Sequence, residues 1–171
     1  MTMAEAFLAE FEQEARATRR FLERLPEGKL GWKPHEKSMT VGQLANHLAT
    51  SPSRVLELAQ LDEAPMPEFG KPEHQPKTLR EVLGAFEETL AQVRKGLPSI
   101  PDSRMQGMWR ITRDGKEVTA MPRAALLRSV MLNHWYHHRG QLGVYLRMLG
   151  AKVPSSYGPS ADELPEFMQS Q

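Results

Sequence analysis

Three of the six histidines in this 171-residue chain lie within residues 134–138, whose sequence is HWYHH. His134 and His138 are four positions apart, so on a helix their imidazoles lie one turn apart on one face and can reach a single divalent ion. The alternative is a pair of core histidines bonded to other protein groups. Burying both beside Gln141 would leave several polar atoms in need of partners, and this favours a metal.

A third ligand must come from elsewhere in the chain, because zinc and nickel sites normally use at least three protein ligands. His47 lies in a strong helical pattern, at the flank of its apolar face. This position suits a site near the mouth of a helix bundle, but the pattern alone leaves a surface or neighbouring role open. His35 and His74 are predicted to be solvent-exposed loop histidines.

The chain contains no cysteine. Thiolate metal sites, disulfides and cysteine nucleophiles are therefore excluded, and a metal must be bound by histidine, carboxylate or water. The predicted inward faces carry no Glu-x-x-His motif, which argues against a di-iron carboxylate protein. The sequence also lacks a zincin motif, a Gly-x-Ser-x-Gly elbow, a Walker loop and a dinucleotide fingerprint.

The elements that must position the histidines are helices. Apolar residues at helical spacing predict four of them, at about residues 3–25, 41–61, 79–95 and 122–149. Three begin with a capping box, in which a Thr and a Glu or Gln three residues later bond each other's backbone N–H. These boxes are Thr2 with Glu5, Thr40 with Gln43, and Thr78 with Glu81.

The helix count and the connections predict the fold. Residues 109–113 and 116–120 flank Asp114-Gly115, a strong hairpin signal, so a two-stranded ribbon is expected between the third and fourth helices. The proline-rich segments 62–76 and 153–165 are predicted to be ordered loops or tails. We expect an all-α four-helix bundle with a small β-hairpin, formed by residues 1–171 as a single domain.

A helical wheel centred on His134 gives the expected inward face of the last helix. It places these residues inward with the two histidines: Leu127, Val130, Met131, Gln141, Tyr145 and Met148. Gln141 is then a candidate to orient a ligand histidine, as is Asn46 beside the third one. No carboxylate can be placed on the inward face, so no catalytic residue is assigned.

The same wheel places Trp135 and Tyr136 outward, with Arg128, Arg139 and Arg147 on the far side. Two large aromatics are not expected to stay fully wet. We therefore expect them to pack under the hairpin or against a second subunit.

The net charge is +1, although residues 104–152 hold nine Lys or Arg against two acids. This segment is predicted to be solvated surface, so no nucleic acid is expected as a partner. The N-terminus lacks a secretory signal, and no apolar run reaches the roughly 20 residues of a membrane span. A cytoplasmic protein with no membrane contact is expected.

Several short runs resemble one known family. They are GWKP at 31–34, SMTVGQLANHL at 38–48, NHWYHHRGQL at 133–142, YLRMLG at 145–150, VP at 153–154 and YGP at 157–159. In this combination the sequence resembles the DinB (DinB/YfiT-like) family. The resemblance implies an up-down-down-up four-helix bundle and one divalent metal ion, commonly zinc or nickel, held by three histidines.

Carried over position by position, the family's ligands correspond to His47, His134 and His138. His137 becomes a neighbour of the site. Met39 stands where many relatives have a Trp or a similarly large residue, so the loop before the second helix is expected to differ in shape.

Function is less sharply implied than fold. Relatives include transferases and isomerases that use a low-molecular-weight thiol such as bacillithiol or mycothiol, and many relatives form homodimers. The resemblance therefore implies a metal-dependent enzyme with a small-molecule substrate, a thiol-dependent S-transferase in particular, that forms a homodimer. A metal-dependent hydrolase and a non-catalytic metal or small-molecule binding protein are the alternatives.

Overall fold

The computed structural model describes residues 1–68, 70–165 and 168 and is mostly helical, as predicted. Its longer helical elements are α1 (Met3–Leu22), α2 (Val41–Gln60), α3 (Leu79–Gly96) and a continuous run made of α5 (Arg123–Leu126), a π-helical segment (Leu127–Asn133) and α6 (His134–Met148). Short elements complete the described part of the chain: α4 (Asp102–Gln106), two 3₁₀ turns and three strands.

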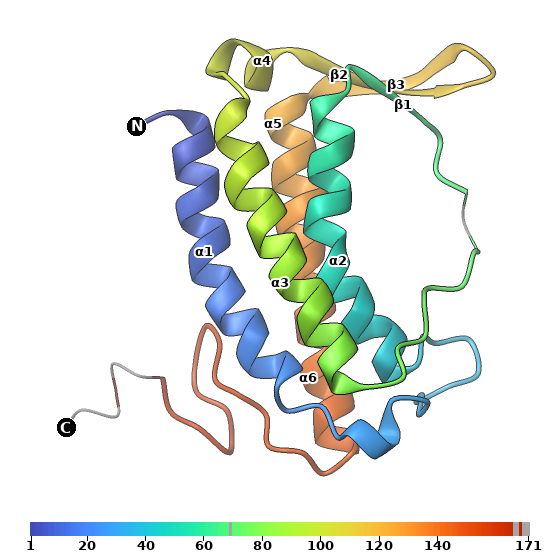
Figure 1. Ribbon diagram of the computed structural model, residues 1–171, viewed down its shortest axis with the longest axis vertical. Coiled ribbons are helices and arrows are strands. Elements are labelled where there is room, and N and C mark those ends of the chain that lie inside the picture. Colours follow the sequence, from blue (N-terminus) through green and yellow to red (C-terminus); the bar gives the residue numbers. More distant parts are fainter. Residues whose placement is uncertain (69, 166–167, 169–171) are drawn as a thin grey trace.

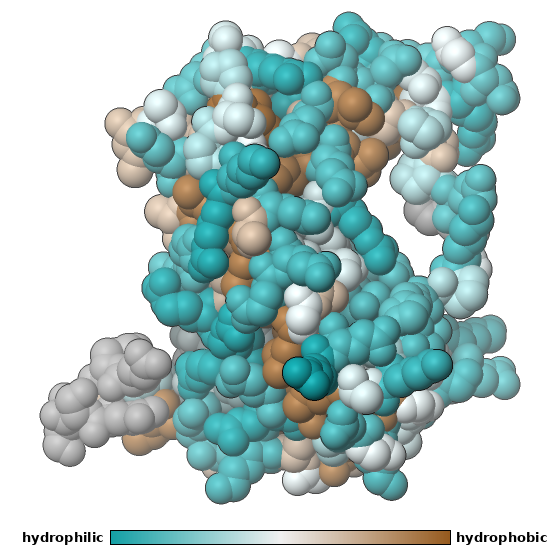
Figure 2. Space-filling view, viewed as in Figure 1, coloured by the Kyte–Doolittle hydropathy of each residue, from teal (hydrophilic) through white to brown (hydrophobic). Residues whose placement is uncertain are grey.

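The long helices lie side by side (Figure 1). α2 and α3 run in one direction, and α1 and the α5–α6 run go in the opposite direction. The sheet and α4 cover one end of the helices, while the connection before α2 and the C-terminal segment lie at the other. The connection from β1 to α3 passes along the outside of the helices, and Figure 2 shows that the face turned to the viewer is largely hydrophilic.

A common apolar core holds the helices together. Fully buried side chains come from each long helix and include Phe11, Leu22, Leu44, Leu48, Phe86, Leu132 and Trp135. Burying one such side chain contributes about 1.5–3 kcal/mol relative to leaving it in water. The helix packing is therefore set by side chains spread over the whole sequence.

The predicted helix starts are correct. Two capping boxes are complete, at Thr2 with Glu5 and at Thr40 with Gln43. In the third, Thr78 Oγ1 accepts the Glu81 N–H, but the Glu81 carboxylate accepts the Lys77 N–H, so the reciprocal bond is absent. One correct capping bond is enough to place the start of α3.

The sheet has one strand more than predicted. β2 (Met108–Arg113) and β3 (Lys116–Pro122) pair antiparallel across Asp114-Gly115, and both turn residues have positive φ. β1 (Glu63–Pro65) adds to β2 in parallel. The sequence did not predict β1, because a three-residue strand in a proline-rich segment has no measurable alternation.

The predicted inward face of the last helical run is wrong for α6, although Leu127 and Met131, which were also predicted inward, are buried. The buried residues of α6 are Trp135, Arg139, Leu142, Gly143 and Leu146. At about 100° per residue this face is centred roughly 120° from His134. Val130 and Met148, both predicted inward, are 37% and 58% exposed. Part of the error comes from the π-helical segment, since the His134 N–H bonds to Ser129 O, five residues back, and changes the register between the two halves of the run.

Arg139 was predicted on the far side but is 2% exposed. Its guanidinium lies 2.6 Å from the carboxylate of Glu14, which is also buried, and Nη1 donates to Glu14 O and Thr18 Oγ1. A buried charge requires such a partner. The ion pair allows an arginine to occupy the core face of α6. A helical wheel does not predict this position, because it assigns a charged side chain to the surface.

Trp135 was predicted outward and is in fact fully buried, stacked on Phe11 with ring centroids 5.1 Å apart. Its Nε1–H donates to Leu48 O at 2.8 Å. In an uninterrupted helix the N–H of residue 52 would bond this carbonyl, but residue 52 is Pro52 and has no N–H. The indole therefore replaces a bond that α2 cannot make itself.

Tyr136 is half-buried, and its hydroxyl donates to Glu10 Oε1 at 2.8 Å. Neither aromatic is left as a large exposed surface. The expectation that the hairpin or a second subunit covers these aromatics is therefore wrong for Trp135, which packs within the core.

The basic segment is largely neutralised within the chain. Six of its nine basic residues form ion pairs with acids in the described ranges: Arg104 and Arg123 with Asp62, Arg110 with Glu117, Arg128 with Glu10, Arg139 with Glu14, and Arg147 with Asp162. No helix in the described ranges has both the length and the apolar character needed to cross a membrane.

Candidate metal centre

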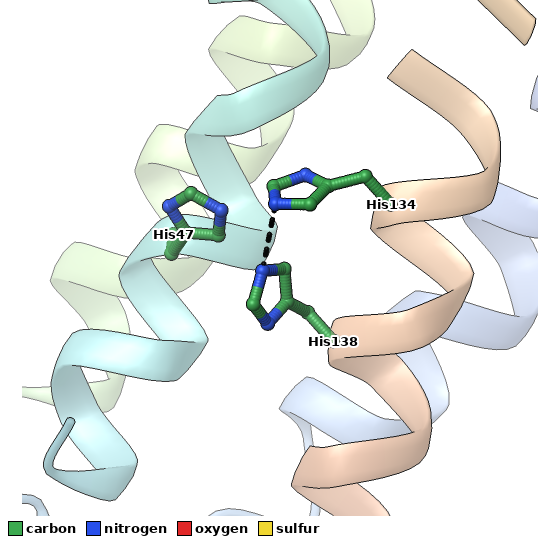
Figure 3. Close-up of side chains that lie close together, drawn as sticks. All are labelled: His47, His134 and His138. Atoms are coloured by element: carbon green, nitrogen blue, oxygen red, sulfur yellow. Dashed lines mark hydrogen bonds between the residues drawn. The ribbon is translucent and has the colours of Figure 1, made fainter. Parts of the chain in front are cut away.

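Three imidazoles from two helices converge beside the core (Figure 3). His47 comes from α2, and His134 and His138 come from successive turns of α6. Their ring centroids are 5.2, 4.6 and 4.3 Å apart, and one nitrogen of each ring lies within 4.8 Å of the others. The structure therefore brings together the three histidines selected from the sequence.

The contact between α2 and α6 that aligns these rings lies next to them in the sequence. Trp135 follows His134, and Leu48 follows His47, so the bond from the Trp135 indole to Leu48 O joins the helices directly beside the histidines. The α6 turn then places His138 below His134, with their Nε2 atoms 2.9 Å apart.

Two of the rings are oriented through Nδ1. His47 Nδ1 lies 2.9 Å from Glu73 Oε1, and His138 Nδ1 lies 2.7 Å from Gln141 Oε1. An oxygen acceptor at Nδ1 keeps the proton there and leaves the Nε2 lone pair free in the neutral ring. Gln141 thus makes the contact expected of it, whereas the buried Asn46 side chain makes no hydrogen bond to His47 within the described chain.

One of the nitrogens that face the centre has no partner, whereas the Nε2 atoms of His134 and His138 contact each other. His47 Nε2 is buried and has no hydrogen-bond partner among the described residues. Leaving such an atom unpaired costs about 1–3 kcal/mol. A divalent cation bound by this lone pair would remove that cost. Three neutral imidazoles form a suitable donor set for zinc or nickel. The residues present therefore fit a metal ion.

Burial keeps the α6 histidines neutral. It lowers the pKa of His138 to about 4, aided by repulsion from His134 and His47 and opposed by the Gln141 hydrogen bond. Burial also lowers the pKa of His134, again with repulsion from neighbouring imidazoles. Both rings are thus unprotonated at neutral pH, which is the form that binds metal.

Glu73 is the carboxylate that the sequence did not place. Burial raises its pKa, but hydrogen bonds and charge from His47 and Arg54 outweigh this and hold the pKa below its usual range. The residue lies in the proline-rich connection between β1 and α3, where no periodicity indicates the direction of a side chain. Only the three-dimensional path of that connection brings it to His47.

The remaining histidines take the places predicted for them. His35 and His74 are exposed on loops, and the His74 ring meets Glu81. His137 is exposed, with its ring centroid 5.1 Å from that of His138. It is a neighbour of the three-histidine cluster and has no place among the converging nitrogens.

Comparisons with known proteins agree with this fold. The sequence model of the DinB family matches residues 1–168. The chain is 28% identical over 167 residues to the uncharacterized protein YrdA of Bacillus subtilis, with 94% of this chain and 92% of YrdA covered.

Two solved structures have a similar fold at 23% sequence identity each. One is a DinB-like protein from Bacillus cereus ATCC 10987, with a TM-score of 0.69 over 90% of this chain and 97% of that one. The other is the DinB-like protein YjoA of Bacillus subtilis, with a TM-score of 0.65 over 95% and 97% of the two chains.

Proposed function

Because the chain belongs to the DinB family, we propose that it binds one divalent metal ion through His47, His134 and His138 and acts as a metal-dependent enzyme on a small molecule. The observation that carries this proposal is the buried Nε2 of His47, which has no partner in the described chain and faces the two α6 imidazoles. Structural histidines would be expected to have both nitrogens paired.

The proposed reaction is thiol conjugation by an S-transferase. The sulfur of a low-molecular-weight thiol loses its proton and bonds to an electrophilic carbon of the substrate, which releases its leaving group. An ion held by three imidazoles keeps open coordination positions and lowers the pKa of a thiol or water that reaches them. The chain has no cysteine, so a reacting thiol must arrive as a cosubstrate. Two further residues hold the ligand set in place: Gln141 fixes the His138 ring, and the Trp135 bond to Leu48 aligns the helices.

The metal proposal is tested by the metal content of protein purified without a histidine tag. We expect about one zinc or nickel ion per chain, lost in His134→Ala and His138→Ala. His137→Ala is the matched control, because this exposed histidine lies on the same helix and outside the cluster. Unchanged metal content in either ligand variant would refute the three-histidine site.

The reaction class is tested with a model electrophile and a panel of low-molecular-weight thiols. Conjugation that disappears in chelator-treated protein and returns with added metal supports the transferase. Turnover that needs water and no thiol identifies a hydrolase instead. Metal binding without turnover identifies a non-catalytic binding protein.

We also propose the up-down-down-up four-helix bundle of the family for residues 1–171, formed as one domain and assembled as a homodimer. The helix directions in Figure 1 support the bundle order. Light scattering after gel filtration tests the dimer, and a single species with the monomer mass would refute the dimer.

The internal pairing of the basic segment supports a protein without a nucleic-acid partner.

A further inference from the structure

We propose that Glu73 is a positioning residue for the metal centre. Its carboxylate holds the His47 imidazole in the tautomer and orientation that turn Nε2 toward His134 and His138. This inference rests on the proposed metal site and concerns a residue on a different segment from the three histidines.

The hydrogen-bond chemistry fixes the tautomer. An ionised carboxylate only accepts, so the 2.9 Å contact between Glu73 Oε1 and His47 Nδ1 requires the proton on Nδ1. The two nitrogens lie at different edges of the ring, and Nε2 is then the unprotonated one. In water the neutral histidine side chain favours the opposite tautomer, with the proton on Nε2. Glu73 therefore selects the form of His47 that can bind an ion from the cluster side.

Glu73 is itself held in place, although it lies in a loop. Its backbone oxygen accepts a hydrogen bond from Gln43 Nε2 at 3.1 Å, and Gln43 is the capping-box residue of α2, one turn before His47. The same helix face thus contacts both the backbone and the carboxylate of Glu73. Arg54, further along α2, reaches the second carboxylate oxygen at 3.3 Å.

The next part of the loop is tied down too. Gln75 accepts a hydrogen bond from Thr40 Oγ1 at 2.6 Å and donates one to Leu30 O at 3.2 Å. These bonds attach the loop to the start of α2 and to the segment before it. Glu73 consequently has a defined position relative to His47, as a positioning residue must.

His47 and His138 differ in the charge of the groups that contact their Nδ1 atoms. His138 is oriented by the neutral amide of Gln141, whereas His47 faces a carboxylate whose side chain is 23% exposed. A partly buried negative charge across the ring makes the imidazole more basic and offsets charge on a bound cation. Loss of this group should therefore weaken metal binding more than loss of a neutral partner.

The experiment compares Glu73→Ala and Glu73→Gln with Glu68→Gln. Glu68 lies on the same connection, is 74% exposed and pairs only with Lys71 in the described chain, so its variant is a matched control for lost charge. Two quantities are measured: the affinity for Zn²⁺ and Ni²⁺ alone by competition with a chelator, and the ¹⁵N shifts of the His47 ring in metal-free protein.

We expect Glu73→Ala to bind metal about 10–100-fold more weakly than wild type, the usual effect of removing such a partner. The His47 ring should shift toward the Nε2–H tautomer. Glu73→Gln keeps an acceptor oxygen without the charge, so it should retain the Nδ1–H tautomer and lose less affinity than Glu73→Ala. Glu68→Gln should match wild type in both measurements.

A Glu73→Ala protein that is folded, binds metal within twofold of wild type and keeps the Nδ1–H tautomer overturns the inference. If that variant fails to fold, the near-isosteric Glu73→Gln decides it. Wild-type affinity together with a shift of His47 to the Nε2–H tautomer would show that the tautomer selected by Glu73 does not support metal binding, and would overturn the inference. Wild-type protein that binds no metal refutes the proposed function instead. In that case the tautomer of His47 still tests the positioning role of Glu73.

Discussion

The hydrogen bond between the Trp135 indole and Leu48 O makes a quantitative prediction about the helix pair that carries the histidines. Trp135→Phe removes the donor, and Pro52 cannot replace it, so a buried backbone carbonyl is left unpaired. That loss costs about 1–3 kcal/mol. The space left by the smaller ring adds to it, for a total of about 2–4 kcal/mol out of a typical stability of about 5–15 kcal/mol.

A double-mutant cycle isolates the hydrogen-bond part. Pro52→Ala restores an N–H that can bond Leu48 O within α2, so Trp135→Phe should cost about 1–2 kcal/mol less in the Pro52→Ala background than in wild type. The assay is urea unfolding of the four chelator-treated proteins, with midpoint and slope both measured. If the cost of Trp135→Phe is the same in both backgrounds, to within about 0.5 kcal/mol, the indole is not compensating for the missing proline N–H.

Three further predictions concern stability. Glu14→Ala should lower the free energy of unfolding by about 3–5 kcal/mol, because it leaves the buried Arg139 charge unpaired. The double variant Glu14→Leu with Arg139→Met should have a thermal stability near that of wild type. A loss of stability in the double variant equal to that in Glu14→Ala would contradict the ion-pair explanation. Gly143→Ala places a methyl group 3.1 Å from an α1 aromatic carbon and should cost about 1 kcal/mol, while Gly140→Ala meets nothing within 4 Å and should gain about 0.5–1 kcal/mol. Metal-free protein should lose stability as the pH falls from about 6.5 to about 4, because burial lowers the pKa of His138 and the folded chain binds fewer protons than the unfolded chain over that range. His138→Gln should show a smaller loss between pH 7.5 and 5 in urea unfolding, and an unchanged loss would refute this cause.

The helix starts were predictable because the relevant interactions are local. A capping box needs only residues three positions apart, and the bonds at Thr2 and Thr40 form as the spacing requires. The Asp114-Gly115 turn is equally local, since both residues must adopt positive φ. β1 was missed because its pairing with β2 depends on a contact between distant parts of the chain.

The orientation of α6 was not predictable from its own sequence. Its polar stripe of His134, His138 and Gln141 lies beside the core, while the true core face includes Arg139. A helical wheel treats arginine as a surface residue, and the partner that makes its burial possible is on α1, at Glu14. The three histidines selected from the sequence nevertheless lie together. The four-residue spacing of His134 and His138 does not depend on which way α6 faces, and His47 was selected through the family resemblance.

The candidate site depends both on local spacing within one helix and on contacts between distant parts of the chain. The spacing of His134 and His138 is fixed within one helix, but their distance to His47 depends on how α6 sits against α2. Pro52 breaks the hydrogen-bond ladder of α2 at Leu48, and Trp135 fills that gap from α6. The missing N–H in α2 is thus replaced by a bond from α6, and this bond joins residues adjacent to His47 and His134. For this reason Trp135→Phe should weaken Zn²⁺ binding as well as stability, and intact affinity in that variant would show that the histidines are aligned by the rest of the core.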